Sequence, residues 1–247
     1  MKQRRGLTAI IVGMLALSAG LYYVEFLMSH EWEPIVSTIL REFAFLPIHA
    51  IVVVVVFEGI LAAREKAAMR HKLNMVIGAF FSEMGQDLVR ALAAFDIELE
   101  EFSPHVVFHT DWTAKEFAAA RDYIETRHHP LRVDEADLAK LMTFLHRNRP
   151  FMLGLLENSN LLEYEAFSEL LWALTHLQEE LDARGSFGEL PSTDLTHLQG
   201  DISRVYGRMI IEWLQYVEHL KSDYPYLYSF TIRTNPFDPN AEIVVAG

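Results

Sequence analysis

The hydrophobic pattern divides the chain into a strongly apolar beginning and a longer amphipathic remainder. Gly6–Val24 contains no charged residue, and residues 7–28 are apolar almost throughout. A second apolar stretch covers residues 43–63 and includes the run Ile51–Phe57. Because a helix rises about 1.5 Å per residue, roughly 20 such residues cross the hydrocarbon core of a bilayer. The pattern therefore predicts a transmembrane hairpin over residues 1–63, with spans at about 7–28 and 43–63.

The charges that flank these stretches predict how the hairpin is oriented. Basic residues precede the first span and follow the second, at Lys2, Arg4, Arg5, Arg64, Lys66, Arg70 and Lys72. The connector, residues 29–42, holds three glutamates and one arginine. Because positive residues stay on the cytoplasmic side, the N-terminus and residues 64–247 should both be cytoplasmic in a multi-pass protein of the inner (plasma) membrane. A cleaved signal peptide that ends near Ala19 is the alternative for the first span.

Small residues in the first span suggest a packing surface. Ala9, Gly13, Ala16 and Gly20 recur at spacings of 4, 3 and 4, which places them on one stripe of a helix. Small side chains let another membrane helix approach closely, so the stripe would face either the second span or a second copy of this chain. Small residues are also common in membrane helices that have no such contact.

The remainder of the chain carries helical periodicity, which predicts an all-α fold with a cytoplasmic helical bundle over residues 64–247. The second span should continue as a helix to about Phe95, and further helices are expected at about 114–126, 134–157, 161–183 and 192–223. In the last of these, apolar residues fall every three or four positions from Leu195 to Leu220, beside a strip of small residues at Gly200, Ser203 and Gly207. The aromatic tail after Tyr224 should dock on the bundle through Tyr226, Leu227 and Phe230.

Several stretches in the second half of the chain resemble those of an uncharacterised prokaryotic family. They are NLLEYE (160–165), ELLWALTH (169–176), EWLQYVEHLK (212–221), YPYL (224–227) and RTNPFD (233–238). Members of that family resemble this chain along most of its length. The resemblance implies two membrane spans followed by a helical cytoplasmic domain, and it carries no known activity and no catalytic residues.

Composition narrows the classes of function. The chain has no cysteine, so a disulfide framework, a zinc thiolate site and a cysteine nucleophile are all excluded. Residues 1–72 hold 8 Lys+Arg against 6 Asp+Glu, whereas residues 73–247 hold 13 against 28, a net charge of −15. Nucleic-acid binding depends on a basic face that neutralises phosphates, so no nucleic-acid partner is expected.

Two polar stripes offer the only candidate site. One helix carries Glu169 and His176, and the next carries His197, Asp201, Glu212 and His219. If the two helices are antiparallel neighbours, His176 lies opposite His197 and Asp201, with Arg204 at the edge, while Glu212 lies nearer Glu169. Imidazoles and carboxylates on facing helices can bind a metal or a polar ligand. The alternative is a solvated structural face of ordinary charge pairs.

These residues do not identify a particular metal or cofactor, so both are unknown from the sequence. The di-iron signature requires a glutamate three residues before a histidine, and none stands before His176, His197 or His219. Nucleotide-binding and hydrolase motifs are absent from the sequence, so no catalytic residue is assigned. The leading interpretation is a membrane-anchored helical module that binds a protein partner or assembles with itself. A small-molecule or metal-binding sensor is the alternative, and an enzyme of unrecognised type is the third.

Overall fold

The fold is all-α wherever it is described. The computed structural model describes residues 16–17, 19–24, 26–27, 33–158, 161 and 164–244, which divide between two compact units, residues 1–66 and 67–247. Every element in these ranges is helical, and the β structure there is limited to an isolated bridge between Asp96 and Leu131. The prediction of an all-α fold is confirmed.

The described part of the N-terminal unit supports one candidate span, and the predicted hairpin of two is not supported. Residues 7–15, with Ala9 and Gly13, lie outside the described residues, and those described between 16 and 27 are helical. Helix α2 (Glu33–Phe80) begins inside the expected connector, because Glu33 and Pro34 form a favourable first helical turn. Among the described residues, one helical run, Glu33–Ala93, contains a window apolar enough to cross a membrane, and none of that window is buried.

The C-terminal unit begins with the last turns of α2, whose apolar residues there are buried. The helix then widens into the π-helical turn η1 (Phe81–Gly85) and continues as α3 (Gln86–Ala93). The predicted continuation of the second span towards Phe95 therefore ends at Ala93. Buried positions at Leu73, Ile77, Phe81, Met84, Leu88 and Leu92 recur at spacings of 4, 4, 3, 4 and 4. This mean of about 3.8 residues exceeds the 3.6 of an α-helix, and the π-turn takes up the extra residue.

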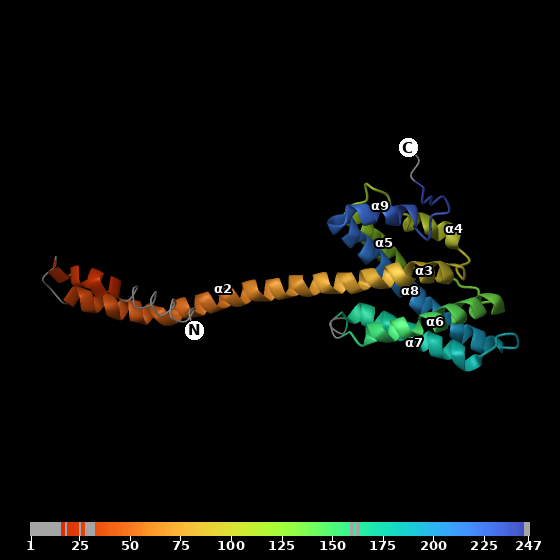
Figure 1. The fold of residues 1–247 in the computed structure, drawn as a ribbon, viewed down its shortest axis with the longest axis horizontal. Helices are drawn as coiled ribbons and strands as arrows, with labels where there is room; N and C mark the ends of the chain where they lie inside the picture. Colours follow the sequence, from red (N-terminus) through yellow and green to blue (C-terminus); the bar gives the residue numbers. More distant parts are fainter. Residues whose placement is uncertain are drawn as a thin grey trace. The chain divides into compact units, whose positions relative to one another are not determined.

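Helix α8 is the centre of this unit. The helices that follow α3 along the chain are α4 (Leu99–Phe102), η2 (Ser103–His105), α5 (Ala114–Thr126), α6 (Glu135–Leu156), α7 (Glu165–Arg184), α8 (Ser192–Asp223) and α9 (Pro225–Arg233). Helices α3, α5, α7 and α9 all pack on α8, and α6 packs on α7 (Figure 1). Two boundaries have a local cause in capping groups: the Thr113 capping box begins α5, and the Asp134 carboxylate begins α6.

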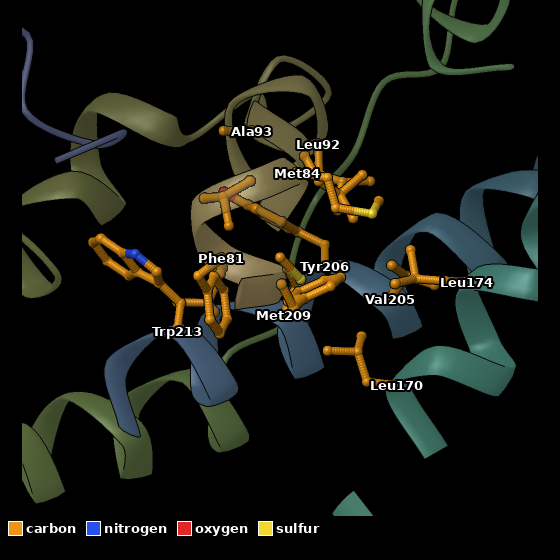
Figure 2. Packing of buried hydrophobic residues seen from close by; sticks show 14 of the residues in the cluster. Phe81, Met84, Leu92, Ala93, Leu170, Leu174, Val205, Tyr206, Met209 and Trp213 are labelled. Atoms are coloured by element: carbon orange, nitrogen blue, oxygen red, sulfur yellow. The ribbon is translucent and has the colours of Figure 1, made fainter. Parts of the chain in front are cut away.

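Aromatic and long aliphatic side chains fill the contact between α8 and the π-turn. Figure 2 shows Phe81 beside Tyr206 and Met209 of α8, and Met84 belongs to the same buried cluster. The Phe81 ring also stacks on Tyr216, with centroids 5.1 Å apart and planes 11° apart. This stacking holds the Tyr216 ring in a position where it lines two cavities between α2 and α8.

The C-terminal tail docks through other residues than those predicted. Tyr228 of α9 is buried, and its hydroxyl donates to the His109 carbonyl oxygen at 2.6 Å. Tyr226, Leu227 and Phe230 are 70 %, 37 % and 44 % exposed, so the prediction that they are buried is wrong. Successive residues of a helix are turned by about 100°, so a face centred on Tyr228 directs Tyr226 and Phe230 away from the bundle.

Gly85 tests how tightly the π-turn is packed. A Cβ at Gly85 would lie 2.6 Å from Cδ1 of Phe81 and 3.0 Å from Cε1 of Phe80, and both rings are buried. Gly85→Ala should therefore destabilise the protein by about 1–3 kcal/mol, as overpacking does. Gly154→Ala in α6 is the matched control because its Cβ meets nothing within 4 Å, so it should stabilise by about 0.4–1 kcal/mol. Thermal unfolding of the two variants should therefore shift in opposite directions, and a shift in the same direction would contradict the packing described.

Candidate functional site

The predicted seam between α7 and α8 contains a cluster of polar side chains. Nε2 of His197 and Nε2 of His176 lie 3.4 Å and 3.6 Å from Oδ2 of Asp201. The Oδ1 atom of Asp201 accepts from Arg204 at 3.0 Å, and Glu180 lies 3.6 Å from His197. The structure thus places His176, His197 and Asp201 together, with Arg204 beside them.

This cluster has the character of a surface charge network. The side chains of His176 and His197 are about half exposed, although Asp201 beneath them is buried. Nη1 of Arg184 donates to Glu180, while its Nε and Nη2 donate to Asp194, and these bonds lower the pKa of both carboxyls. Among the described residues, no group of three or more His, Asp or Glu side chains is arranged to hold a metal ion.

Two further predicted residues lie apart from this cluster. Oε2 of Glu169 forms an ion pair with Nη2 of Arg208 at 3.0 Å, and both side chains are exposed. His219 lies 3.0 Å from Asp223 and lines a cavity of about 360 Å³ between α2, α8 and α9. The six candidate residues therefore do not form one site, and a ligand-binding role for each of them remains a prediction.

Glu212 is the candidate residue with the most unusual surroundings. It is 3 % exposed and lines a cavity of about 240 Å³ between the end of α2 and α8. The lining consists of Arg70, Leu73, Asn74 and Ile77 from α2, Tyr164 before α7, and Glu212, Gln215 and Tyr216 from α8. A buried carboxyl faces a small, mostly apolar space with a few polar groups around it, which is the usual composition of a ligand pocket.

Few hydrogen-bond donors and no cationic side chain among the described residues offset the cost of burying a charge at Glu212. The Tyr164 hydroxyl lies 2.6 Å from Oε1 of Gln215 but 3.4 Å from Oε1 of Glu212, at the outer limit of a hydrogen bond. A phenol has a single proton, so the shorter contact with Gln215 weakens the bond to Glu212, and Glu212 has no cationic side chain within ion-pair distance among the described residues. Burial raises the pKa of Glu212 to about 7, and the bond from Tyr164 opposes this rise only in part.

Other buried polar groups were not expected from the sequence. Arg127 and Asp96 form an ion pair at 2.9 Å, with side chains that are 8 % and 0 % exposed. Burial acts against the charge on Asp96, but bonds from His129 and Arg127 lower its pKa. His129 is buried against Gly207. A Cβ at position 207 would lie 3.6 Å from Nε2 of His129, in ordinary van der Waals contact, whereas one at Gly200 would meet no atom within 4 Å.

Sequence reasoning identified Glu212 but missed the residues around it. Tyr164, Asn74 and Arg70 come from distant segments, and no spacing links them to α8. The sequence did hold a signal for the carboxyl itself, since Glu212 lies three residues after the buried Met209 and next to the buried Trp213. A glutamate within the apolar face of a helix indicates burial at a functional or structural site.

Comparison with known proteins gives a family. A profile described as the C-terminal helical domain of the uncharacterized protein MJ1433 matches residues 69–233, and one described as its N-terminal helical domain matches residues 2–61. The uncharacterized protein MJ1433 of Methanocaldococcus jannaschii is 38 % identical over 245 residues, covering 99 % of this chain and 98 % of that protein. The chain belongs to the MJ1433 family. No solved structure matches it.

Membership in the MJ1433 family confirms the coarse part of the resemblance. The family consists of helical domains of unknown function, as expected. Its descriptions assign neither a membrane span nor a partner, so both stay proposals. The profile of the MJ1433 C-terminal domain covers all six candidate residues and the whole lining of the Glu212 cavity.

The pKa of Glu212 predicts how stability depends on pH. In the unfolded chain the carboxyl loses its proton near its ordinary pKa of 4.5, whereas in the folded protein it keeps the proton up to about pH 7. The folded state therefore binds more protons between these values, and stability falls as pH rises from about 4.5 to 7, by about 3 kcal/mol in total. Glu212→Gln should remove this loss, so it should leave stability unchanged near pH 4.5 and raise it at pH 8.

Thermal unfolding of the wild type and the variant at pH 5 and pH 8 measures this difference. Glu83→Gln is the control, because Glu83 is exposed in the neighbouring π-turn. An equal shift at both pH values would show that the Glu212 carboxyl is ionised throughout.

Proposed function

We propose that this protein is a membrane-anchored helical module that acts by binding a protein partner at the cytoplasmic face of the membrane. The observation that carries the proposal is the apolar surface of α2. Ile51–Phe57 are seven consecutive apolar residues, and each is between 52 % and 68 % exposed. Seven residues make about two turns, so the exposed apolar surface surrounds the helix.

Water is a poor solvent for such a surface. Burial of one large aliphatic or aromatic side chain is worth about 1.5–3 kcal/mol, and soluble proteins rarely leave a contiguous apolar patch of more than a few hundred Å² uncovered. A lipid bilayer covers a helix on all sides at once, whereas a partner helix covers one face. The basic residues Arg64 and Arg70 after this stretch support a cytoplasmic location for residues 67–247.

The partner surface proposed here is the exposed face of α9, defined by Tyr226, Leu227 and Phe230. Aromatic residues are enriched in protein interfaces, where they supply large contact areas at low entropic cost. The guanidinium of Arg233 lies over the Phe230 ring, 5.8 Å from its centroid, and adds a polar edge to the surface. A small-molecule sensor is the second candidate function, and the cavity at Glu212 favours it.

Cysteine labelling tests the anchoring and its orientation. The chain has no native cysteine, so Ser37→Cys and Ser186→Cys each introduce a single thiol at an exposed position. A membrane-impermeant maleimide should label position 37 in intact cells and position 186 only after permeabilisation. Labelling of 186 but not 37 would reverse the orientation, and recovery of the protein in the alkaline-wash supernatant would exclude the anchor.

Photo-cross-linking tests the partner surface. A benzophenone amino acid in place of Tyr226 should give a discrete higher-mass product in living cells, and the same replacement at Trp172 is the control. Trp172 is also a well-exposed aromatic residue, at 60 % against 70 %, but it lies on α7. Equal products from both positions, or none from position 226, would contradict the assignment of α9 as the interface.

A further inference from the structure

We infer that the cavity beside Glu212 is a binding site for a small zwitterion of amino-acid size, with its ammonium group at Glu212 and its carboxylate at Arg70. The inference concerns residues 67–247 alone. It stands or falls independently of the membrane anchor and of the α9 interface.

The first argument is the unbalanced carboxyl. Glu212 is buried with one hydrogen bond at 3.4 Å, and the described residues offer it no ion pair. A buried carboxylate is stable only with a cation or several donors close to it. The cavity lies directly against the carboxyl, so a cation that enters the cavity would supply what the protein itself does not.

The second argument is the set of acceptors around the same space. An ammonium group has three N–H donors and no acceptor. The cavity lining provides a carboxylate at Glu212 and amide oxygens at Gln215 and Asn74, and these three can accept one N–H each. A hard divalent cation would need six or more oxygen ligands, several of them charged, and this lining has one carboxylate.

The third argument is Arg70, the cationic side chain among the residues that α2 contributes to the cavity lining. Arg70, Leu73, Asn74 and Ile77 are spaced 3, 1 and 3 residues apart, so they lie on one face of α2. Arg70 is exposed, and the described residues give its guanidinium no ion pair or hydrogen bond. Guanidinium groups bind carboxylates through two parallel hydrogen bonds, and a simple amine would gain nothing from Arg70.

The fourth argument is size. A water molecule occupies about 30 Å³ in the liquid, so a cavity of about 240 Å³ has room for roughly eight molecules or eight non-hydrogen atoms. Leu73, Ile77 and the Tyr216 ring provide apolar walls for the carbon skeleton between the two charged ends. Free ω-amino acids with three to five carbons have six to eight non-hydrogen atoms and fit this description.

Binding to the full-length protein in detergent is the test. Thermal unfolding is followed at pH 8 with 10 mM of each L-α-amino acid and of ω-amino acids up to six carbons, and with n-butylamine and butyrate as single-charge probes. At least one zwitterion should raise the midpoint by several degrees, and the single-charge probes should have little effect. The absence of any stabilising zwitterion, or equal stabilisation by butylamine, would overturn the inference.

Calorimetric titration with the best zwitterion then assigns the two charged ends. Glu212→Gln and Arg70→Gln should each weaken binding at least tenfold, and Glu83→Gln should not change it. Glu212→Gln removes a buried charge and Arg70 is exposed, so both variants are expected to fold. Unchanged affinity in either variant would overturn the corresponding end of the site and with it the zwitterion.

Discussion

The contact between the last turns of α2 and helix α8 is the constraint on which the C-terminal unit depends. From Leu73 onwards, α2 changes from an exposed helix to a buried one, and Phe80, Phe81, Met84 and the residues after them become part of the core. Helix α8 is buried along most of its length because α3, α5, α7 and α9 all pack on it. The helix that carries the apolar stretch is therefore also one wall of the domain's core.

The candidate cavities lie along this same contact, and residues of both α2 and α8 line each of them. Tyr216, held by its stacking on Phe81, lines both the cavity at Glu212 and the one at His219. A ligand at Glu212 would touch α2 and α8 together, so its binding would stabilise their contact.

Local signals in the sequence predicted most of the helices but not the geometry of the site. The bounds of α5 and α8 follow from the Thr113 capping box and from apolar residues at helical spacing, both of which are properties of neighbouring residues. The cavity at Glu212 could not be predicted, because Asn74 and Tyr164 reach it only through tertiary packing. The error at Tyr226 has a related cause: the sequence shows an aromatic tail, and only its folding into α9 and the docking of that helix decide which ring is buried.

The π-turn has a consequence for the length of the chain. Nineteen residues separate Leu73 from Leu92, and at about 100° each they overshoot five full turns by roughly one residue. An unbroken α-helix one residue shorter would join the same two faces, so the wider turn is not needed for connection. The additional residue instead supplies a second inward-facing ring. Phe80 packs on Phe167 of α7, and Phe81 packs on Tyr216 of α8, so two adjacent residues contact two different helices.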